Sequence, residues 1–155
     1  MDFYIFLCYN SIVKKICGGF LMKHLNVVAG IIFFGDEILC MQRPESKHEY
    51  ISYKFEFPGG KIDPGETEVE ALKRELMEEM DMKVQVDEST KFLVVNHTYP
   101  DFEITMHSYI CKVDTKEFVM KEHKDFIWLK KEKLARLDWA MADMPIVIKL
   151  MTQKP

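Results

Sequence analysis

The chain has 155 residues, of which 48% are hydrophobic and 30% are charged, so it is long enough to fold as one domain around a single core. This composition excludes long disorder and collagen-like or low-complexity repeats. Acidic residues outnumber basic residues by 25 to 21, and the formal net charge of -4 argues against a protein that grips long nucleic acid. A small phosphorylated ligand, which needs only a few local cations, is compatible with this charge.

The amino-terminal segment differs from the rest of the chain. Its apolar stretch over residues 3–13 is too short for a membrane-spanning helix, and Asp2 stands where a secretory signal would carry basic residues. We therefore expect residues 1–21 to be an N-terminal extension that arises from a misplaced gene start. The biological start would be Met22, with one domain over residues 22–155. The alternative is a weak peripheral membrane anchor.

The cysteines predict a reducing compartment. The four of them form neither a C-x-x-C pair nor a zinc-site spacing, which is typical of a cytoplasmic protein. Cys40 and Cys111 lie within apolar runs, and we expect both to be small core residues.

From Leu25 onward, strand-like and helix-like segments follow one another without a linker or a repeat. Runs rich in β-branched and aromatic residues predict strands over residues 25–34, 37–43, 53–57, 92–99, 102–113 and 126–129. Residues 67–80 contain neither Pro nor Gly and predict the principal helix. Pro145 fits the first turn of a terminal helix that runs to about residue 151. This mixture predicts an α/β domain of the α+β type.

The principal helix carries a ridge of carboxylates. At about 100° per residue, Glu75, Glu78 and Glu79 fall within one arc, beside an apolar arc that can face a sheet. Glu68 falls in the same acidic arc. Clustered like charges destabilise a helix unless cations neutralise them, and Mg²⁺ or Mn²⁺ prefers carboxylate oxygens. The structural alternative is a solvated acidic face.

The residues before this helix favour the metal site over the solvated face. Gly59 and Gly60 follow a predicted strand and allow the backbone to approach a ligand closely. Lys61 comes next and can meet a phosphate as a point charge. Glycines, a lysine and a carboxylate ridge together indicate a site for a metal ion and a polyphosphate.

These residues resemble the signature of the Nudix hydrolase family. Gly60 is followed by five residues to Glu66 and by seven more to Arg74–Glu75, and Glu78–Glu79 and Met82 complete the box. The resemblance covers about residues 25–150 and implies the Nudix fold, a mixed β-sheet sandwiched between helices. Many fixed positions at fixed spacing make the signal specific.

One position of the box departs from the family pattern. Asp81 stands where the family has Gly, at the residue after the helix end that commonly adopts a left-handed conformation. Asp tolerates that conformation better than most residues. The departure touches no expected metal ligand, so it bears on local stability more than on activity.

The chain looks closest to the MutT-like branch of the family, on residues 54–61, 99–101 and 142–147. That branch hydrolyses nucleoside triphosphates to monophosphate and pyrophosphate, by attack at the β-phosphorus. The resemblance therefore implies metal-dependent hydrolysis of nucleoside triphosphates, with a role in sanitation of the nucleotide pool.

The resemblance also implies roles for individual residues. It assigns metal binding to a carbonyl of Gly59 or Gly60 and to the carboxylates of Glu75, Glu78 and Glu79. Glu122 resembles a loop glutamate that assists metal binding or deprotonates water, and Arg43 resembles an arginine that contacts phosphate. Glu75 is the first choice for the general base and Glu122 the second. Arg74 is expected to orient the helix through ion pairs, and His123 either lines the site or lies at the surface.

Recognition of the base depends on Asp143. It precedes the terminal helix, so a side-chain N-cap is one complete explanation. At the matching position the MutT-like branch carries an Asn that reads oxidised guanine. An ionised Asp only accepts hydrogen bonds and fits the amino group of cytosine, while a protonated Asp can donate as well. Asp143 thus favours cytidine-type triphosphates or broad activity over strict 8-oxo-dGTP hydrolysis, and both interpretations stay open.

Two alternative functions remain. One is hydrolysis of other nucleoside diphosphate derivatives, such as ADP-ribose or dinucleoside polyphosphates. The other is a non-catalytic nucleotide-binding module, which should have lost a box carboxylate, whereas this chain keeps all three. In each case we expect a nucleotide ligand, neither long nucleic acid nor a membrane as partner, and a monomer or homodimer.

Overall fold

The computed structural model describes residues 15–17 and 20–153. Its strands are β1 (Lys15–Cys17), β2 (Phe20–Phe34), β3 (Glu37–Gln42), β4 (Phe55–Glu56), β5 (Gly59–Lys61), β6 (Lys91–Thr98), β7 (Phe102–Lys112) and β8 (Asp125–Lys130). They form one mixed sheet in which the order along the main path is β4-β3-β2-β7-β6. The pair β2–β7 is parallel and the other strand pairs are antiparallel. In addition, β1 and β5 pair with β2, and β8 pairs with β3.

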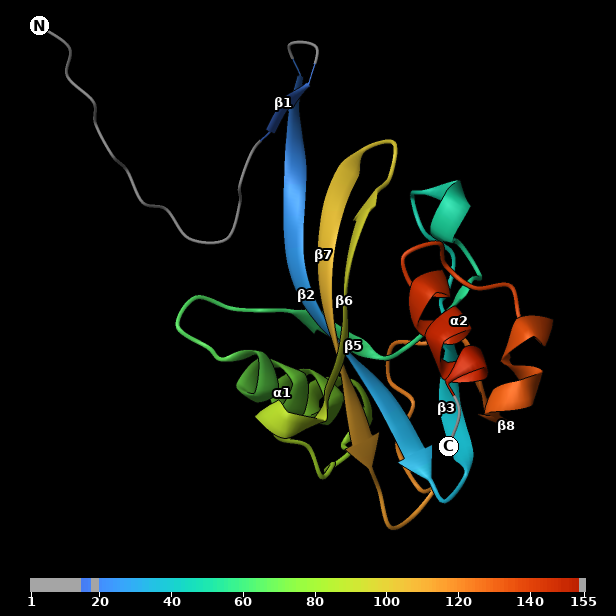
Figure 1. Cartoon of the computed structure of the whole chain (residues 1–155). Coiled ribbons are helices and arrows are strands. Elements are labelled where there is room, and N and C mark those ends of the chain that lie inside the picture. Colours follow the sequence, from blue (N-terminus) through green and yellow to red (C-terminus); the bar gives the residue numbers. More distant parts are fainter. Residues whose placement is uncertain (1–14, 18–19, 154–155) are drawn as a thin grey trace, which may run out of the picture.

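Helices cover both faces of this sheet (Figure 1). The helix α1 (Glu68–Met80) packs Leu72 and Leu76 against one face, together with Val28 and Ile32 of β2. The helix α2 (Met144–Thr152) and the 3-10 helix Lys131–Arg136 pack against the other face. Two shorter 3-10 helices span Glu49–Ile51 and Glu88–Thr90. The expected mixed sheet between helices is therefore confirmed.

The helix α1 has defined signals at both ends. Thr67 caps its first turn, since its side chain accepts a hydrogen bond from the Glu70 N–H at 3.2 Å while the Glu70 carboxylate accepts from the Thr67 N–H at 2.8 Å. After Met80, Asp81 adopts the expected left-handed conformation, with φ of 51°, and its N–H reaches the Met77 carbonyl at 3.0 Å. These caps set where the carboxylate-bearing turns begin and end.

The sheet departs from the predicted strands at three places. β2 begins at Phe20 rather than Leu25, and the predicted strand over residues 53–57 shortens to β4. The Gly59–Lys61 segment, which was not among the predicted strands, is the strand β5 paired with Val27–Ala29 of β2. A Cβ at Gly59 would lie 2.0 Å from the Val28 carbonyl oxygen, so only glycine lets β5 lie this close to β2.

Cys40 and Cys111 are free, fully buried core residues, as predicted. Burial raises the pKa of both thiols to about 12, which keeps them protonated and unreactive.

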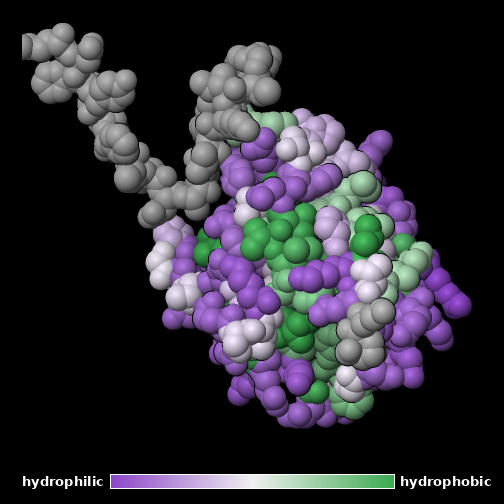
Figure 2. All heavy atoms as spheres, viewed as in Figure 1, coloured by the Kyte–Doolittle hydropathy of each residue, from purple (hydrophilic) through white to green (hydrophobic). Residues whose placement is uncertain are grey.

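The surface is mostly hydrophilic. In Figure 2, hydrophobic residues come to the surface along the middle of one face, over the sheet between α1 and α2, with hydrophilic residues around them. None of the helices in residues 20–153 has the length and apolar character that a membrane crossing requires. Most of the expected extension, residues 1–14 and 18–19, lies outside the described residues, so the expected domain boundary at Met22 stays a prediction.

Candidate active site

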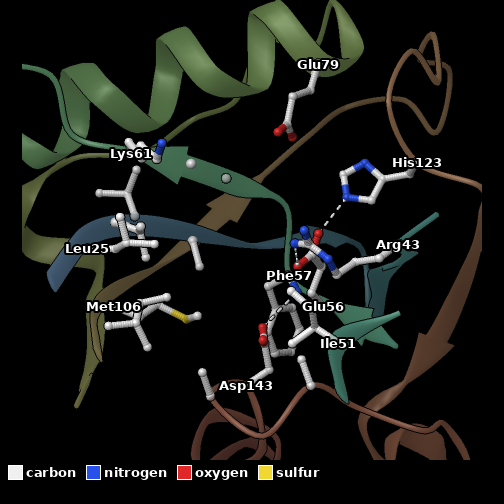
Figure 3. A pocket seen from close by; sticks show the side chains of 18 of the residues that line it. Leu25, Arg43, Ile51, Glu56, Phe57, Lys61, Glu79, Met106, His123 and Asp143 are labelled. Carbon is white, nitrogen blue, oxygen red and sulfur yellow. Dashed lines mark hydrogen bonds and ion pairs between the residues drawn. The ribbon is translucent and has the colours of Figure 1, made fainter. Parts of the chain in front are cut away.

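A cavity of about 360 Å³ lies over the middle of β2, between α1 and the segment that precedes α2 (Figure 3). Glu79 and Asp143 stand at opposite ends of it in this view. The sequence-predicted site residues that line it are Arg43, Gly59, Gly60, Lys61, Glu79, Glu122 and Asp143. Glu75 and Glu78 are not among the lining residues. One end of the cavity is therefore polar and charged, and the other combines apolar side chains with Asp143.

Glu79 is a buried acid without a hydrogen-bond partner. Its side chain is 8% exposed, and its Oε2 finds no donor among the described residues. Burial raises the pKa of Glu79 to about 8, and the nearby carboxylates of Glu122, Glu56 and Glu75 add to this shift. A buried carboxylate without a hydrogen-bond partner, close to other carboxylates, marks a position where a cation or a hydrogen-bond donor would bind favourably.

The Glu75 carboxyl group lies next to Gly60 of β5, which lines the cavity, although Glu75 itself does not line it. A Cβ at Gly60 would lie 2.3 Å from the Glu75 carboxyl group, so glycine at this position makes the room that Glu75 occupies. The Glu75 Oε1 accepts a hydrogen bond from Arg74 Nη1 at 2.9 Å. The glycine that the sequence suggested for close approach of a ligand thus also accommodates a box carboxylate.

Arg74 forms the expected ion pairs on α1, with Glu75 and Glu78, and also binds the segment before the helix. Its Nε and Nη2 donate to the two oxygens of Glu66 at 2.6 and 2.8 Å, and Nη2 also reaches the Lys61 carbonyl at 3.0 Å. These contacts, together with the Asp63 N–H, lower the pKa of Glu66 to about 2. Glu78 is 60% exposed and approaches Arg74 at 3.3 Å. Arg74 is therefore shared between the helix and the loop that leads from β5.

Glu56 joins Arg43 to His123 and is a site residue that the sequence did not indicate. Glu56 Oε2 accepts from Arg43 Nη1 at 2.7 Å, and its Oε1 lies 3.0 Å from His123 Nε2 (Figure 3). The Arg43 Nε and the His123 Nδ1 are buried without partners. His123 lines the cavity, which decides the question that the sequence left open. An acid between two aromatic residues of a strand, Phe55 and Phe57, was the available signal for Glu56.

Asp143 is buried, 2% exposed, and does not cap α2 through its side chain. The helix-cap interpretation is wrong, because the Asp143 Oδ1 instead accepts the Phe57 N–H at 2.9 Å, across the cavity wall. Burial, and then the carboxylate of Glu56, raises the pKa of Asp143 well above its usual range. Next to it, the Ala142 N–H donates to the Tyr99 hydroxyl at 3.1 Å. Asp143 thus presents a carboxyl group that favours its protonated form.

Glu68 does not join the carboxylate ridge, contrary to the helical-arc argument. It stands in the first turn of α1, where its Oε2 meets Lys91 Nζ at 2.6 Å and its Oε1 lies 3.1 Å from His107 Nδ1. The Tyr109 hydroxyl also donates to Glu68. These partners lie on β6 and β7, so tertiary contacts turn this carboxylate away from the cavity.

The chemistry of the polar end fits a hard divalent cation. Carboxylate oxygens are the preferred ligands of Mg²⁺, and Glu79 offers a buried oxygen without a partner, close enough to Glu75 and Glu122 for their charges to raise its pKa. Within residues 20–153, however, no three acidic, histidine or cysteine side chains stand ready to hold a metal ion. Arg74 holds Glu75 and Glu78, so a cation would have to draw them away from it.

Comparison with known proteins decides the family. Residues 24–150 match the NUDIX domain. The chain belongs to the Nudix hydrolase family. Nudix hydrolases generally use divalent metal ions such as Mg²⁺, which agrees with the oxygen-rich polar end of the cavity.

Relatives of this Nudix hydrolase include two enzymes of Escherichia coli K12. An 8-oxo-dGTP diphosphatase is 33% identical over 130 residues, which cover 83% of this chain and 98% of the relative. A CTP pyrophosphohydrolase is 30% identical over 136 residues, covering 81% and 90%. Among solved structures, the MutT Nudix hydrolase from methicillin-resistant Staphylococcus aureus 252 is 38% identical with a TM-score of 0.66, covering 86% of this chain and 99% of that one. The MutT-like branch indicated by the sequence is confirmed.

Proposed function

We propose that this Nudix hydrolase converts nucleoside triphosphates to nucleoside monophosphate and pyrophosphate in a divalent-metal-dependent reaction, acting on cytidine-type and oxidised guanine nucleotides. One observation carries the proposal. A single cavity joins a carboxylate-lined end, with Glu79 and Glu122, to an apolar end that contains Asp143. The first end suits a phosphate chain with its cation, and the second suits a base. The activities of the two E. coli relatives support these substrate classes.

The reaction needs charge neutralisation and a base. Arg43 and Lys61 line the cavity and can stabilise charge on the phosphoryl oxygens as the bond breaks. A bound Mg²⁺ supplies further positive charge to the phosphates and makes water easier to deprotonate. Water forms a bond to the β-phosphorus while the bond from that phosphorus to the bridging oxygen of the α-phosphate breaks. We propose that Glu75 takes the water proton once it has left Arg74, with Glu122, which already lines the cavity, as the alternative acceptor.

Asp143 is proposed to read the base as a protonated carboxyl group. Its raised pKa favours a hydroxyl donor on one oxygen, while the other accepts the Phe57 N–H. In this state Asp143 offers a donor where an Asn would offer its amide N–H. The preference for cytidine-type nucleotides assumed an ionised Asp143, which can only accept hydrogen bonds. A protonated Asp143 can also donate, so this reason to disfavour oxidised guanine no longer applies, and we propose activity on both classes.

A substrate screen tests the function. The full chain is incubated with Mg²⁺ and CTP, dCTP, 8-oxo-dGTP, dGTP, ADP-ribose or a dinucleoside polyphosphate, and the products are separated by ion-exchange chromatography. We expect monophosphate and pyrophosphate from the cytidine and 8-oxo-guanine nucleotides, and no turnover after chelation with EDTA. Inorganic phosphate as the product, or preferred hydrolysis of ADP-ribose or the dinucleoside polyphosphate, would overturn the proposal.

Two variants test the role of Asp143. Asp143→Asn keeps a donor and an acceptor, so we expect the ratio of kcat/KM for 8-oxo-dGTP and dCTP to stay within about tenfold of the wild type. Asp143→Ala removes both and should lower kcat/KM for both substrates by about tenfold or more. If Asp143→Asn instead shifts the ratio towards 8-oxo-dGTP by more than tenfold, Asp143 acts as an ionised acceptor.

A further inference from the structure

Asp81, the departure from the signature box, makes a tertiary contact. Its Oδ1 lies 2.6 Å from Nζ of Lys121, which belongs to the loop between β7 and β8. The backbone of Asp81 has the left-handed conformation expected after a helix end, with φ of 51°. This conformation does not require an acidic side chain, so the contact with Lys121 needs a separate explanation.

Two local rules disfavour an acid at this position. Glycine adopts a left-handed backbone with less strain than Asp. The carbonyl groups at the C-terminal end of a helix also carry partial negative charge, which favours a nearby cation and disfavours an anion. The last turn of α1, residues 77–80, already contains two acids and no basic residue. Asp81 is therefore unfavourable for the helix alone, and the loop that carries Lys121 is the part that it stabilises.

The loop over residues 113–124 forms neither helix nor strand and is attached to the C-terminal end of α1. The Val119 N–H donates to the Met80 carbonyl at 3.0 Å. The Lys121 N–H donates to the Glu79 carbonyl at 3.2 Å. Both carbonyls belong to the last turn of the helix, where intrahelical donors are lacking. Lys121 thus binds the end of α1 through its backbone and, by way of the ion pair, through its side chain.

This attachment determines where Glu122 lies. Glu122 follows Lys121 directly and lines the cavity, as does Glu79. Glu79 therefore offers its backbone carbonyl to the loop and its carboxyl group to the cavity. In Figure 3 the side chain of Glu79 reaches the cavity from α1, and His123, the next residue of the loop, reaches it from the neighbouring segment. A shift of residues 119–121 along the helix end would move Glu122 relative to Glu79.

We propose that Asp81 is a positioning residue of the hydrolase, which holds the loop against α1 through Lys121 and so keeps Glu122 beside Glu79 in the cavity. Asp81 does not touch the substrate. Gly, which the family has at this position, lacks a side chain and cannot form the contact. The departure therefore affects activity as well as the local stability that the sequence suggested. The effect on the rate rests on the proposed hydrolysis, whereas the effect on the loop is measurable without a substrate.

Hydrogen exchange of the loop tests the contact directly. Asp81→Asn removes the charge and keeps a residue that tolerates the left-handed backbone, and Lys121→Gln removes the cation. In the metal-free protein, NMR should show that the protection factors of the Val119 and Lys121 amides fall by about two- to fivefold in each variant, as expected for loss of an exposed ion pair. The double variant should lose no more protection than either single variant, because both substitutions break the same contact.

Asp36→Asn is the matched control. Asp36 forms an exposed ion pair with Lys130 at 2.8 Å, in the turn between β2 and β3. The control should leave the protection of the Val119 and Lys121 amides unchanged. Unchanged protection in Asp81→Asn, or an equal loss in Asp36→Asn, would overturn the inference.

Steady-state kinetics test the effect on the reaction, with the substrate that the wild type hydrolyses best. Asp81→Asn and Lys121→Gln should each lower kcat by about two- to fivefold with little change in KM, and the two losses should not add. Asp81→Gly should lower kcat to the same extent, although glycine suits the helix end better. Melting temperatures should stay close to that of the wild type. If Asp81 only ends the helix, Asn and Gly would both preserve kcat, and this result would overturn the inference.

A Glu122→Gln background separates the action through Glu122 from any other. In that background Asp81→Asn should cause no further loss of kcat, because the group that Asp81 positions is already gone. A further loss of the same size would overturn the link to Glu122. If the wild type hydrolyses no nucleoside triphosphate, the proposed function fails, while hydrogen exchange still decides whether Asp81 holds the loop.

Discussion

At the scale of single residues, the cavity contains acids that cost the fold stability. Glu79 and Asp143 are both buried, and burial raises the pKa of each. Such groups weaken the apo protein because a buried carboxyl group loses the hydration that would stabilise its charged form, and they are retained where a ligand uses them. Glu78 provides the contrast, since it belongs to the same box but is exposed.

The pair Glu79→Gln and Glu78→Gln separates function from stability. Both should lower kcat/KM by about ten- to a hundredfold if each carboxylate holds the metal ion. Only Glu79→Gln should raise the free energy of unfolding of the metal-free protein at neutral pH, by about 1–3 kcal/mol, because it removes a buried acid. Urea denaturation and steady-state kinetics of both variants provide the measurement.

The pH dependence of this effect has a definite sign. The pKa of Glu79 rises from 4.5 to about 8 on folding. The contribution of Glu79 to the free energy of unfolding is therefore fully present below pH 4.5 and is lost as the pH rises through 8. The stability of the metal-free wild type should therefore decline over this range, and that of Glu79→Gln should decline less. Identical pH profiles for the two proteins would contradict this assignment.

At the scale of elements, β5 brings the backbone of the signature box against the sheet. A Cβ at Gly59 would lie 2.0 Å from the backbone oxygen of Val28, whereas a Cβ at Gly60 would lie 2.3 Å from the flexible end of the Glu75 side chain. Gly59 therefore makes room for the neighbouring strand β2, and Gly60 makes room for the candidate catalytic carboxylate of Glu75.

Alanine at these two positions should give different defects. Gly59→Ala should destabilise the fold by about 2 kcal/mol or more, or prevent folding, because backbone must move. Gly60→Ala should fold with a loss of about 1 kcal/mol and lower kcat/KM by about tenfold or more, because Glu75 is displaced. Melting temperatures and steady-state kinetics, measured for both variants, test whether Gly59→Ala mainly affects stability and Gly60→Ala mainly affects activity. Equal stability losses in the two variants would contradict the proposed division.

The start of α1 depends on Glu66 and its contacts with Arg74. Because the pKa of Glu66 falls from 4.5 to about 2 on folding, its stabilising contribution is present above 4.5 and is lost as the pH falls through 2. Glu66→Gln should therefore lower the melting temperature at neutral pH and flatten its fall over this acid range. The exposed Glu117→Gln serves as the control, and an equal flattening there would refute the role of Glu66.

At the scale of the whole molecule, the parallel pair β2–β7 runs through the centre of the sheet and brings distant segments together. β2 pairs with β7 from Lys23 to Phe33, and with β1 only over Phe20–Met22. The β2–β7 pairing that supports the cavity therefore begins after Met22.

A chain that starts at Met22 should fold and work like the full chain. The truncation removes β1 and two residues of β2 but leaves the whole β2–β7 register in place. We expect a melting temperature within about 3 °C of the full chain and an unchanged kcat/KM. Insoluble expression or a much lower melting temperature would show that residues 1–21 stabilise the domain.

What the sequence determined by itself is local. The bounds of α1, the left-handed Asp81 after it, the strands β6 and β7 and the spacing of the signature box follow from preferences that act over a few residues. Family and chemistry could be inferred from these, because the box residues lie within one loop and one helix.

Tertiary structure alone decided which side chains meet. Asp143 and Phe57 are 86 positions apart and form a hydrogen bond, which replaces the helix cap that local sequence suggested. Glu68 shares a helical arc with Glu75 but bonds to β6 and β7 instead. The physical reason is that helix periodicity specifies direction around one axis, while the partner of a side chain depends on strand register and on which face packs against it.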